Sequence, residues 1–391
     1  MTPYIDFLYF GILLLYIVIP TLLFSPFKRL SQFWLVAATA IMLVIQYSGL
    51  HNLTATSQTM ELTTVLGFAL LEWLVAGGFL LLCKRGSNRY VFYLALALGL
   101  GPLLLTRILL ISQPDYPLVF AGLSYVTFRV LDVIIGIQDG LITSLPPMQY
   151  LTFLLFFPTI SSGPIDRYQR FAEDWKRNRT RAEFLSDLDG AVQRVFTGFL
   201  YKFILAALIK QYWLDPVSRG MDYFHIGSYM YAYTFYLFFD FAGYSAFAVG
   251  FSYLFGIHTP ENFNRPFLSR DIRDFWNRWH MSLSFWFRDN IYNRFVFAAL
   301  KGHWFKQRYT ASYLGYMLTM GLMGVWHGLA LHYLVYGLYH GLLLSATDWL
   351  SRHYKNSKLL NDSGFFWQSA SVLLTFHLVA FGLLIFSGRL F

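Results

Sequence analysis

Long apolar segments, separated by short polar stretches, recur along almost the whole chain. Several are close to or above the ~20 residues that a helix needs to cross the hydrocarbon of a bilayer. They are residues 7–24, 33–47, 62–82, 90–111, 195–213, 228–255, 309–326, 333–350 and 365–386. With shorter segments between them, this pattern predicts an all-α, polytopic membrane protein of about 10 to 11 transmembrane helices.

The composition agrees with a membrane location. Of 391 residues, 56% are hydrophobic and 13% are charged, whereas a soluble domain has about 25% charged residues. Too few charges are present to cover a surface that faces water. The first apolar segment lacks a basic start and a small-residue cleavage site, so we interpret it as a retained span rather than a signal peptide.

The net charge of +9 is concentrated between the spans. Lys and Arg gather in residues 27–31, 83–90, 167–181 and 352–358, whereas residues 48–61 and 112–117 contain neither. This alternation follows the positive-inside rule and predicts an N-terminus outside the membrane and basic loops in the cytosol. Nucleic acid is a poor candidate partner, because the basic residues do not share one soluble face.

We predict a single membrane domain, residues 1–391, with three parts. Residues 1–112 are scaffold spans, 113–350 form the functional core, and 351–391 are a cytosolic loop and the last span. The scaffold spans have few internal charges, whereas polar and ionisable residues enter the apolar segments more often in the core, where they are expensive and face the protein interior or a wet cavity. Arg129 and Asp132 are three residues apart, so a helix would place them on one face as an ion pair.

Two segments of the core are predicted to lie in the membrane without crossing it fully. Residues 148–160 are too short to cross and end at Ser161-Ser-Gly-Pro164, so we interpret them as re-entrant. The charged residues 167–189 are predicted to form one or two interfacial helices. Thr180 and Glu183 have the spacing of a capping box, in which each side chain bonds the other residue's backbone N–H.

An aromatic-rich stretch follows the extended segment between Pro260 and Pro266. Five large or polar residues of this stretch recur at intervals of three and four, and would line one face of a single amphipathic helix at the cytosolic interface. They are Trp276, Trp279, His280, Leu283 and Phe287. The nearby arginines are placed to reach lipid headgroups or an acidic group.

His327 lies in a segment, residues 313–331, that has no charged side chain. A lone histidine on an apolar helix is more often a core residue bonded to a carbonyl than a catalytic group. Gly324 and Gly328 flank this one and are predicted to leave room for a substrate to approach the ring. No Asp, Glu, Lys or Arg within fifteen residues offers a simple ion-pair role.

Two rival functions use the same residues differently. In a transporter, Arg129, Asp132 and Asp240 would line a substrate path, although the two halves show no matching pair of broken helices. In a metalloenzyme, the histidines would bind zinc, but His-Glu-x-x-His is absent. His327 and His332 have no carboxylate near them in sequence, so we predict no metal.

The polar motifs together resemble the signature of the membrane-bound O-acyltransferases. They are Glu261-Asn-Phe-Asn-Arg-Pro266, Asp274-Phe-Trp-Asn-Arg-Trp-His280, Leu283-Ser-Phe-Trp-Phe-Arg-Asp289 and Val325-Trp-His-Gly328. The resemblance covers about residues 120–340 in the expected order. It implies a ring of spans around a central funnel, with His327 at the catalytic position and His280 at that of the second histidine. A structural hydrogen bond remains an equal alternative for His280.

The same resemblance implies roles for residues around the two histidines. Asn262, Asn264, Trp276, Trp279, Ser284, Asp289 and Trp326 would contact substrate or line the tunnel, although Asn262 and Asn264 are also ordinary turn residues. Docking of an acyl carrier protein would fall on Ile291, Arg294, Phe295, Val296 and Phe297.

Residues 161–171 and 288–297 are most similar to the branch that transfers D-alanine in Gram-positive bacteria. This implies a plasma-membrane enzyme with no bound cofactor, whose donor is D-alanine on the phosphopantetheine arm of a carrier protein (DltC). Lipoteichoic acid would be the acceptor, and DltD and a small membrane peptide (DltX) would be partners. His327 would act as general base or form a covalent intermediate. The alternative is a polysaccharide O-acetyltransferase, whose usual Pro-Leu-Gly-Gly segment after Arg-Asp-Tyr is absent.

Overall fold

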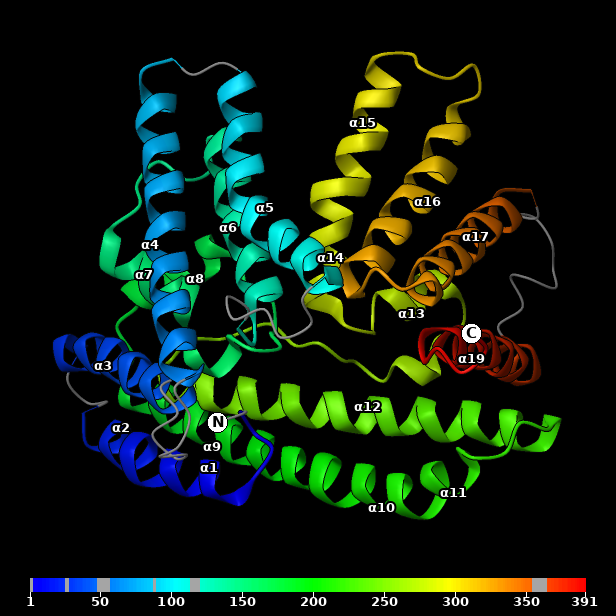
Figure 1. Ribbon diagram of the computed structural model, residues 1–391, viewed down its shortest axis with the longest axis horizontal. Coiled ribbons are helices and arrows are strands. Elements are labelled where there is room, and N and C mark those ends of the chain that lie inside the picture. Colours follow the sequence, from blue (N-terminus) through cyan, green and yellow to red (C-terminus); the bar gives the residue numbers. More distant parts are fainter. Residues whose placement is uncertain (1–2, 25–27, 48–56, 87–88, 113–119, 354–363) are drawn as a thin grey trace. The chain divides into compact units, whose positions relative to one another are not determined.

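The predicted apolar segments are helices in a computed structural model of the chain (Figure 1). The structure describes residues 3–24, 28–47, 57–86, 89–112, 120–353 and 364–391. Within these ranges no strand occurs, and the isolated bridge is a single pairing of Phe263 with Trp279. The prediction of an all-α fold is confirmed.

The helices divide into two units, each compact by itself. Unit 1 comprises Met1–Gly198 with Tyr244–Pro260, and unit 2 comprises Phe199–Gly243 with Glu261–Phe391. Two long helical stretches pass from one unit into the other. The first runs from α9 (Arg181–Phe199) into unit 2, and the second is α12 (Tyr223–Leu254), which returns to unit 1.

Unit 1 contains the N-terminal helices and the broken segment after them. Its helices are α1 (Phe7–Leu13), the π-helical η1 (Leu14–Val18), α2 (Ile19–Phe24), α3 (Lys28–Tyr47), α4 (Ser57–Lys84), α5 (Arg89–Ser112), α6 (Leu123–Gln138), α7 (Pro147–Leu155), the 3-10 turn η2 (Phe157–Thr159), α8 (Tyr168–Lys176) and most of α9. The four predicted spans of residues 1–112 thus coincide with helices.

Unit 2 begins in the continuation of α9 and holds the aromatic motifs. Its elements are η3 (Leu200–Ala206), α10 (Ala207–Ile209), η4 (Lys210–Leu214), α11 (Asp215–Val217), the first part of α12, η5 (Pro266–Leu268), α13 (Ile272–Trp276), α14 (Met281–Phe287), η6 (Arg288–Tyr292), α15 (Asn293–Lys301), α16 (Arg308–His327), α17 (Leu331–His353) and α19 (Phe365–Phe386).

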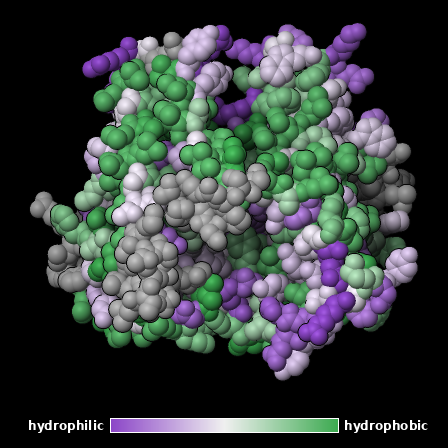
Figure 2. Space-filling view, in the orientation of Figure 1, coloured by the Kyte–Doolittle hydropathy of each residue, from purple (hydrophilic) through white to green (hydrophobic). Residues whose placement is uncertain are grey.

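Five helical stretches of the described residues are long and apolar enough to cross a membrane. They are Glu61–Lys84, Arg89–Leu110, Arg181–Val217, Tyr223–Leu254 and Phe365–Phe386. Apolar side chains cover the outer faces of α4 and α5 (Figure 2), where Leu70 and Leu74 are more than half exposed. Such faces are stable against lipid rather than water. The count of 10 to 11 crossings remains a prediction.

A buried arginine holds the broken segment of unit 1 together. The chain leaves helical geometry at Phe156, between α7 and η2, which frees backbone carbonyls at this point. The Arg129 guanidinium is 1% exposed and donates to the carbonyl oxygens of Phe153 (2.8 Å), Leu154 (3.0 Å) and Thr159 (2.8 Å). The segment is therefore short and broken as predicted, and its re-entrant position in the membrane remains a prediction.

The predicted ion pair between Arg129 and Asp132 is wrong. Asp132 forms an ion pair with Arg167 instead and accepts from the backbone N–H of Tyr168 at 3.3 Å. The carbonyls at the chain break lie within reach of Arg129 and accept from its two terminal nitrogens. Spacing along one helix therefore placed both side chains correctly near the interior but could not identify their partners.

The predicted interfacial helices are α8 and α9, and the capping box is confirmed. The Glu183 backbone N–H donates to Thr180 Oγ1 at 3.2 Å, and the Thr180 N–H donates to Glu183 Oε2 at 2.8 Å. Arg170 and Arg179 pair with acidic side chains of the same helices. The basic charge of this stretch is thus largely balanced within unit 1.

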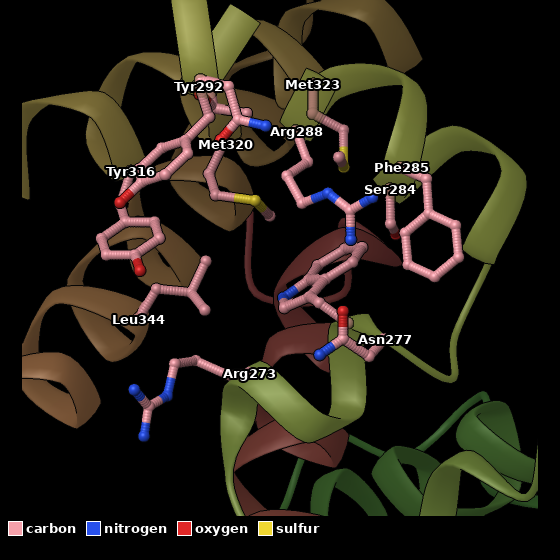
Figure 3. Close-up of a pocket in the computed structure, with 13 residues that line it drawn as sticks. Arg273, Asn277, Ser284, Phe285, Arg288, Tyr292, Tyr316, Met320, Met323 and Leu344 are labelled. Carbon is pink, nitrogen blue, oxygen red and sulfur yellow. The ribbon is translucent and has the colours of Figure 1, made fainter. Parts of the chain in front are cut away.

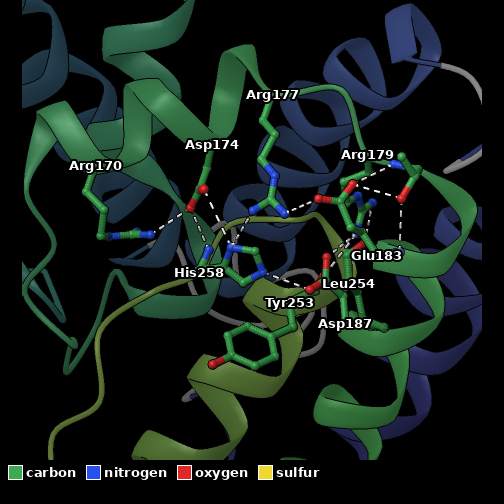
Figure 4. A network of polar contacts seen from close by, with 10 residues as sticks. Arg170, Asp174, Arg177, Arg179, Glu183, Asp187, Tyr253, Leu254 and His258 are labelled. Carbon is green, nitrogen blue, oxygen red and sulfur yellow. Dashed lines mark hydrogen bonds and ion pairs between the residues drawn. The ribbon is translucent and has the colours of Figure 1, made fainter.

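A histidine joins these helices to the end of α12 (Figure 4). His258 Nε2 lies 2.7 Å from Asp187 Oδ1, and the His258 backbone N–H donates to Asp174 at 2.7 Å. Arg179 donates to the carbonyl of Leu254 at 3.1 Å. Hydrogen bonds with Asp174 and then Asp187 raise the pKa of His258 to about 9, so its charged form ties three segments of unit 1 together.

Candidate active site

The aromatic stretch of unit 2 is two short helices rather than one. α13 ends at Trp276 and α14 begins at Met281, with Asn277–His280 forming the turn between them. The Asn264 backbone N–H donates to the Arg278 carbonyl, and the Met281 N–H donates to the Asn262 carbonyl, each at 2.9 Å. These bonds replace helical ones. The prediction of one continuous helix is wrong, because the extended segment pairs with this turn.

The break gives His280 an unusual backbone position. His280 has φ +43° and ψ +49°, in the left-handed region that costs a side chain about 1 kcal/mol or more, and it directly precedes α14. Its ring is buried, 3% exposed, and packs 4.8 Å from the Phe241 ring of α12. In a regular helix the ring would occupy a different direction, so the turn aims it.

Asn262 supports this turn from the extended segment. It is completely buried, and its side-chain oxygen accepts from the Ser282 hydroxyl at 2.6 Å. Its backbone carbonyl holds Met281, the first residue of α14. Asn262 therefore positions the helix that follows His280 through bonds to residues about twenty positions away.

His327 is the last residue of α16 and lies among aromatic rings. Its ring centroid is 4.6 Å from Trp326, 4.9 Å from Phe386 and 6.1 Å from Tyr333. Trp326 also stacks 6.5 Å from the His280 ring. The two histidines are close enough to interact electrostatically, so tertiary structure brings together two residues that are 47 positions apart in the sequence.

The glycines beside His327 have a different purpose from the one predicted. A Cβ on Gly324 would lie 2.3 Å from the Tyr333 carbonyl oxygen, and one on Gly328 would lie 2.5 Å from the Tyr333 ring. On α17, a Cβ on Gly337 would lie 2.2 Å from the Met320 carbonyl oxygen of α16. These glycines let α16 and α17 pack at close range, and the space they leave is filled by Tyr333 rather than by substrate.

A pocket of about 230 Å³ lies beside these helices in unit 2 (Figure 3). Trp276 and Ser284, two of the predicted tunnel residues, line it. Met320 and Met323 lie on one side of it, and Arg273 and Arg288 add positive charge to an otherwise apolar and aromatic wall. The pocket therefore suits an elongated, partly apolar ligand that carries an anionic group.

One face of α16 leads from this pocket to His327. Tyr316, Met320, Met323 and His327 follow at intervals of four, three and four residues, which places them on the same side of a helix. Met323 is four residues before His327, so about 6 Å of helix separates them. The helix face that lines the pocket at Met320 and Met323 therefore continues to His327.

Three pocket features were missed or underrated by sequence reasoning. His340 of α17 is completely buried, and its Nδ1 lies 3.4 Å from the indole nitrogen of Trp276, whose N–H donates to it. Arg273 lies 3.8 Å from Asp348. Arg288 stacks on the Phe285 ring at 4.5 Å. No periodicity along the chain links α17 to the aromatic motifs, so only the fold could place His340 there.

The other predicted tunnel residues are distributed around the site. Trp279 is buried and stacks 5.5 Å from Phe275. Asn264 and Asp289 are exposed and lie outside the pocket; Asp289 pairs with Arg288 at 3.0 Å. Their roles in substrate binding stay predictions.

The predicted docking residues lie on η6 and α15, next to the pocket. Ile291, Phe295 and Val296 are half-buried, whereas Arg294 and Phe297 are exposed, Phe297 by 68%. Phe297 shares the outer face of α15 with Lys301. Within the described ranges, no three His, Cys, Asp or Glu side chains gather as metal ligands would.

Comparisons with known proteins give one consistent picture. The model of the MBOAT, membrane-bound O-acyltransferase family, matches residues 28–386. A teichoic acid D-alanyltransferase of Bacillus subtilis (strain 168) is 42% identical, over 100% of this chain and 99% of the relative. One from Lacticaseibacillus rhamnosus is 43% identical, over 78% of this chain and 79% of the relative. A probable alginate O-acetylase of Pseudomonas syringae pv. tomato is 30% identical, over 81% of this chain and 58% of the relative.

Proposed function

The chain belongs to the membrane-bound O-acyltransferase family, and on that premise we propose that this membrane-bound acyltransferase transfers D-alanine toward the hydroxyls of lipoteichoic acid. The observation that carries the proposal is the full-length similarity to a teichoic acid D-alanyltransferase. The alginate relatives match over little more than half of their own length.

The donor in this proposal is D-alanine held as a thioester on the phosphopantetheine arm of a carrier protein, DltC. The pocket beside α16 has the properties that such an arm requires, because Met320 and Met323 offer apolar contact and Arg273 and Arg288 offer partners for its phosphate. The arm would extend along α16 and deliver the thioester carbonyl to His327. No cofactor of the enzyme's own is needed, since a thioester is already activated.

His327 acts as the general base in the transfer. Its neutral imidazole takes the proton of the acceptor hydroxyl while the hydroxyl oxygen forms a bond with the thioester carbonyl carbon. The carbon–sulfur bond then breaks, and the leaving thiolate takes the proton back from the imidazolium. His280 is held by the turn between α13 and α14 and supports the site from beside Trp326. The centroids of these two rings are 6.5 Å apart.

The carrier docks on the outer face of α15. Arg294 and Lys301 would pair with an acidic carrier protein around the exposed Phe297 ring, next to the pocket that Asn293 also lines. The positive-inside topology puts this face in the cytosol of a bacterial plasma membrane and the N-terminus outside. DltD and the small peptide DltX would then receive or relay the alanyl group on the outer side.

The decisive experiment is reconstitution with DltC that carries labelled D-alanine. We expect His327→Ala to lower transfer by about 10²- to 10⁴-fold, the range of general-base catalysis, with an unchanged thermal midpoint. His377→Ala is the matched control, because His377 lies on the exposed side of α19 and bonds its own helix at Leu373. We expect this variant to transfer D-alanine like the wild type.

Two results would contradict the proposal. Normal transfer by folded His327→Ala protein would exclude His327 as the general base. Transfer of acetyl but not D-alanyl groups would leave the family intact and remove the substrate. Phe297→Asp gives an independent measurement, since it should weaken DltC binding without changing the rate of thioester hydrolysis by the enzyme at saturating carrier.

A further inference from the structure

An arginine that has no acidic partner in the described part of the chain lies at the C-terminal turn of unit 2. Arg389 follows α19 and donates to the Gly220 carbonyl, between α11 and α12, at 2.5 Å. Its guanidinium lies over the Tyr229 ring at 5.3 Å from the centroid. Among the described residues no carboxylate lies within ion-pair distance of Arg389, and its buried Nε has no hydrogen-bond acceptor.

This arginine belongs to the surroundings of His327. Phe386, one helical turn before Arg389, packs 4.9 Å from the His327 ring. A Cβ on Gly388 would lie 3.3 Å from the His332 ring, which in turn packs 4.1 Å from Tyr333. The C-terminal turn therefore closes over the end of α16 at which His327 lies, on the side away from the pocket-lining residues that precede His327 by four and seven positions.

The neighbouring charges reinforce the positive character of this rim. Arg219 is exposed and directly precedes Gly220, whose carbonyl holds Arg389. The nearby acids have partners of their own: Asp215 pairs with Lys210 at 2.9 Å, and Asp222 pairs with His225 at 2.5 Å. The planar guanidinium of Arg389 is half-buried and donates to one carbonyl, and such a group favours an anion with two acceptor oxygens, such as a phosphate.

We propose that Arg389, with Arg219 beside it, binds a phosphodiester of the anionic acceptor polymer and thereby places an acceptor hydroxyl near His327. This inference rests on the function proposed above and adds the group that recognises the acceptor. The positive-inside topology puts the turn after α19 and the turn after α11 on the outer side, where such a polymer lies. A phospholipid headgroup carries the same chemistry and is the competing source of the phosphate.

The test measures binding of a short glycerol-phosphate oligomer to the purified full-length protein in uncharged nanodiscs, without carrier or donor. We expect binding to weaken with salt, and Arg389→Gln to weaken it at least about tenfold, as expected for the loss of a charge-assisted bidentate contact. Arg389→Lys should recover part of the affinity, because it restores charge but not the planar fork. Lys210→Gln is the matched control and should bind normally, since Lys210 is already paired with Asp215.

The remaining outcomes separate the alternatives. Oligomer binding by Arg389→Gln equal to the wild type would overturn the inference, and so would binding of phosphatidylglycerol in nanodiscs with no affinity for the oligomer. If the oligomer binds through Arg389 but the enzyme transfers acetyl groups, D-alanine is excluded as the transferred group, whereas the anion-binding role of Arg389 is supported. If D-alanine transfer proceeds and substitution of Arg389 has no effect on oligomer binding, only the inference about Arg389 is contradicted.

Arg219→Gln, which leaves the Gly220 contact in place, should reduce affinity even if Arg389→Gln folds poorly.

Discussion

Arg129 in unit 1 and His280 in unit 2 are buried basic side chains, and His327 in unit 2 is half-buried, but the surroundings of Arg129 differ from those of the histidines. Arg129 donates to three backbone carbonyls at a break in the chain. His327 and His280 lie among aromatic rings, at the end of a helix face that begins in a pocket. The first arrangement completes the fold, whereas the second brings two imidazole rings together among aromatic side chains.

The difference shows that an ionisable residue in an apolar segment does not by itself indicate function. Both regions satisfy the rule that such residues face the protein interior. What separates the two regions is the set of neighbouring groups. Around Arg129 these are backbone carbonyl oxygens, whereas the two histidines lie among aromatic rings at the end of a helix face that begins in a pocket. A substitution that changes stability but not the transfer rate indicates a structural residue, and one that changes the transfer rate but not stability indicates a functional residue.

The largest stability effect is expected for Arg129→Met. Removing the guanidinium leaves the Phe153, Leu154 and Thr159 carbonyls buried without this donor, at about 1–3 kcal/mol each, so we expect a loss of roughly 3–9 kcal/mol. Thermal unfolding of the purified protein would measure it, with His327→Ala as the stable control. A normal midpoint combined with lost transfer would instead place Arg129 in the catalytic machinery.

A smaller effect of opposite sign is expected for Glu72→Met. Glu72 of α4 is completely buried, and neither carboxyl oxygen has a hydrogen-bond partner among the described residues. Burial of a polar group without a partner costs about 1–3 kcal/mol, so an apolar side chain of similar length should raise the unfolding midpoint. Lower stability or slower transfer in this variant would reveal a role for the carboxyl group.

The smallest effect is expected for His258→Gln and depends on pH. Because its folded pKa of about 9 exceeds its ordinary value of 6.5, charged His258 stabilises unit 1 fully below pH 6.5, and this contribution is lost as the pH rises through 9. Its partial exposure limits the gain to about 1 kcal/mol or less. The midpoints of wild type and variant should therefore differ at pH 6 and converge near pH 10. A constant difference would assign the effect to packing.

The sequence by itself determined the helical fold, the limits of the long apolar helices and the residue types of the site. Apolar length and periodicity report local preferences, and these were sufficient for α4, α5, α12 and α19. The capping box at Thr180 and Glu183 was equally local and equally predictable. The motifs around His280 and His327 also indicated the family to which the chain belongs.

Tertiary structure alone decided the contacts that join distant segments. The pairing of Asn262 and Asn264 with the turn before α14 broke a helix that periodicity predicted, because backbone bonds to another segment replaced the local ones. Arg129 donates to backbone carbonyls instead of pairing with Asp132, and the space beside Gly324 is occupied by Tyr333 rather than by a substrate. A sequence lists which groups need partners, but it cannot say which partners come within reach until the chain has folded around them.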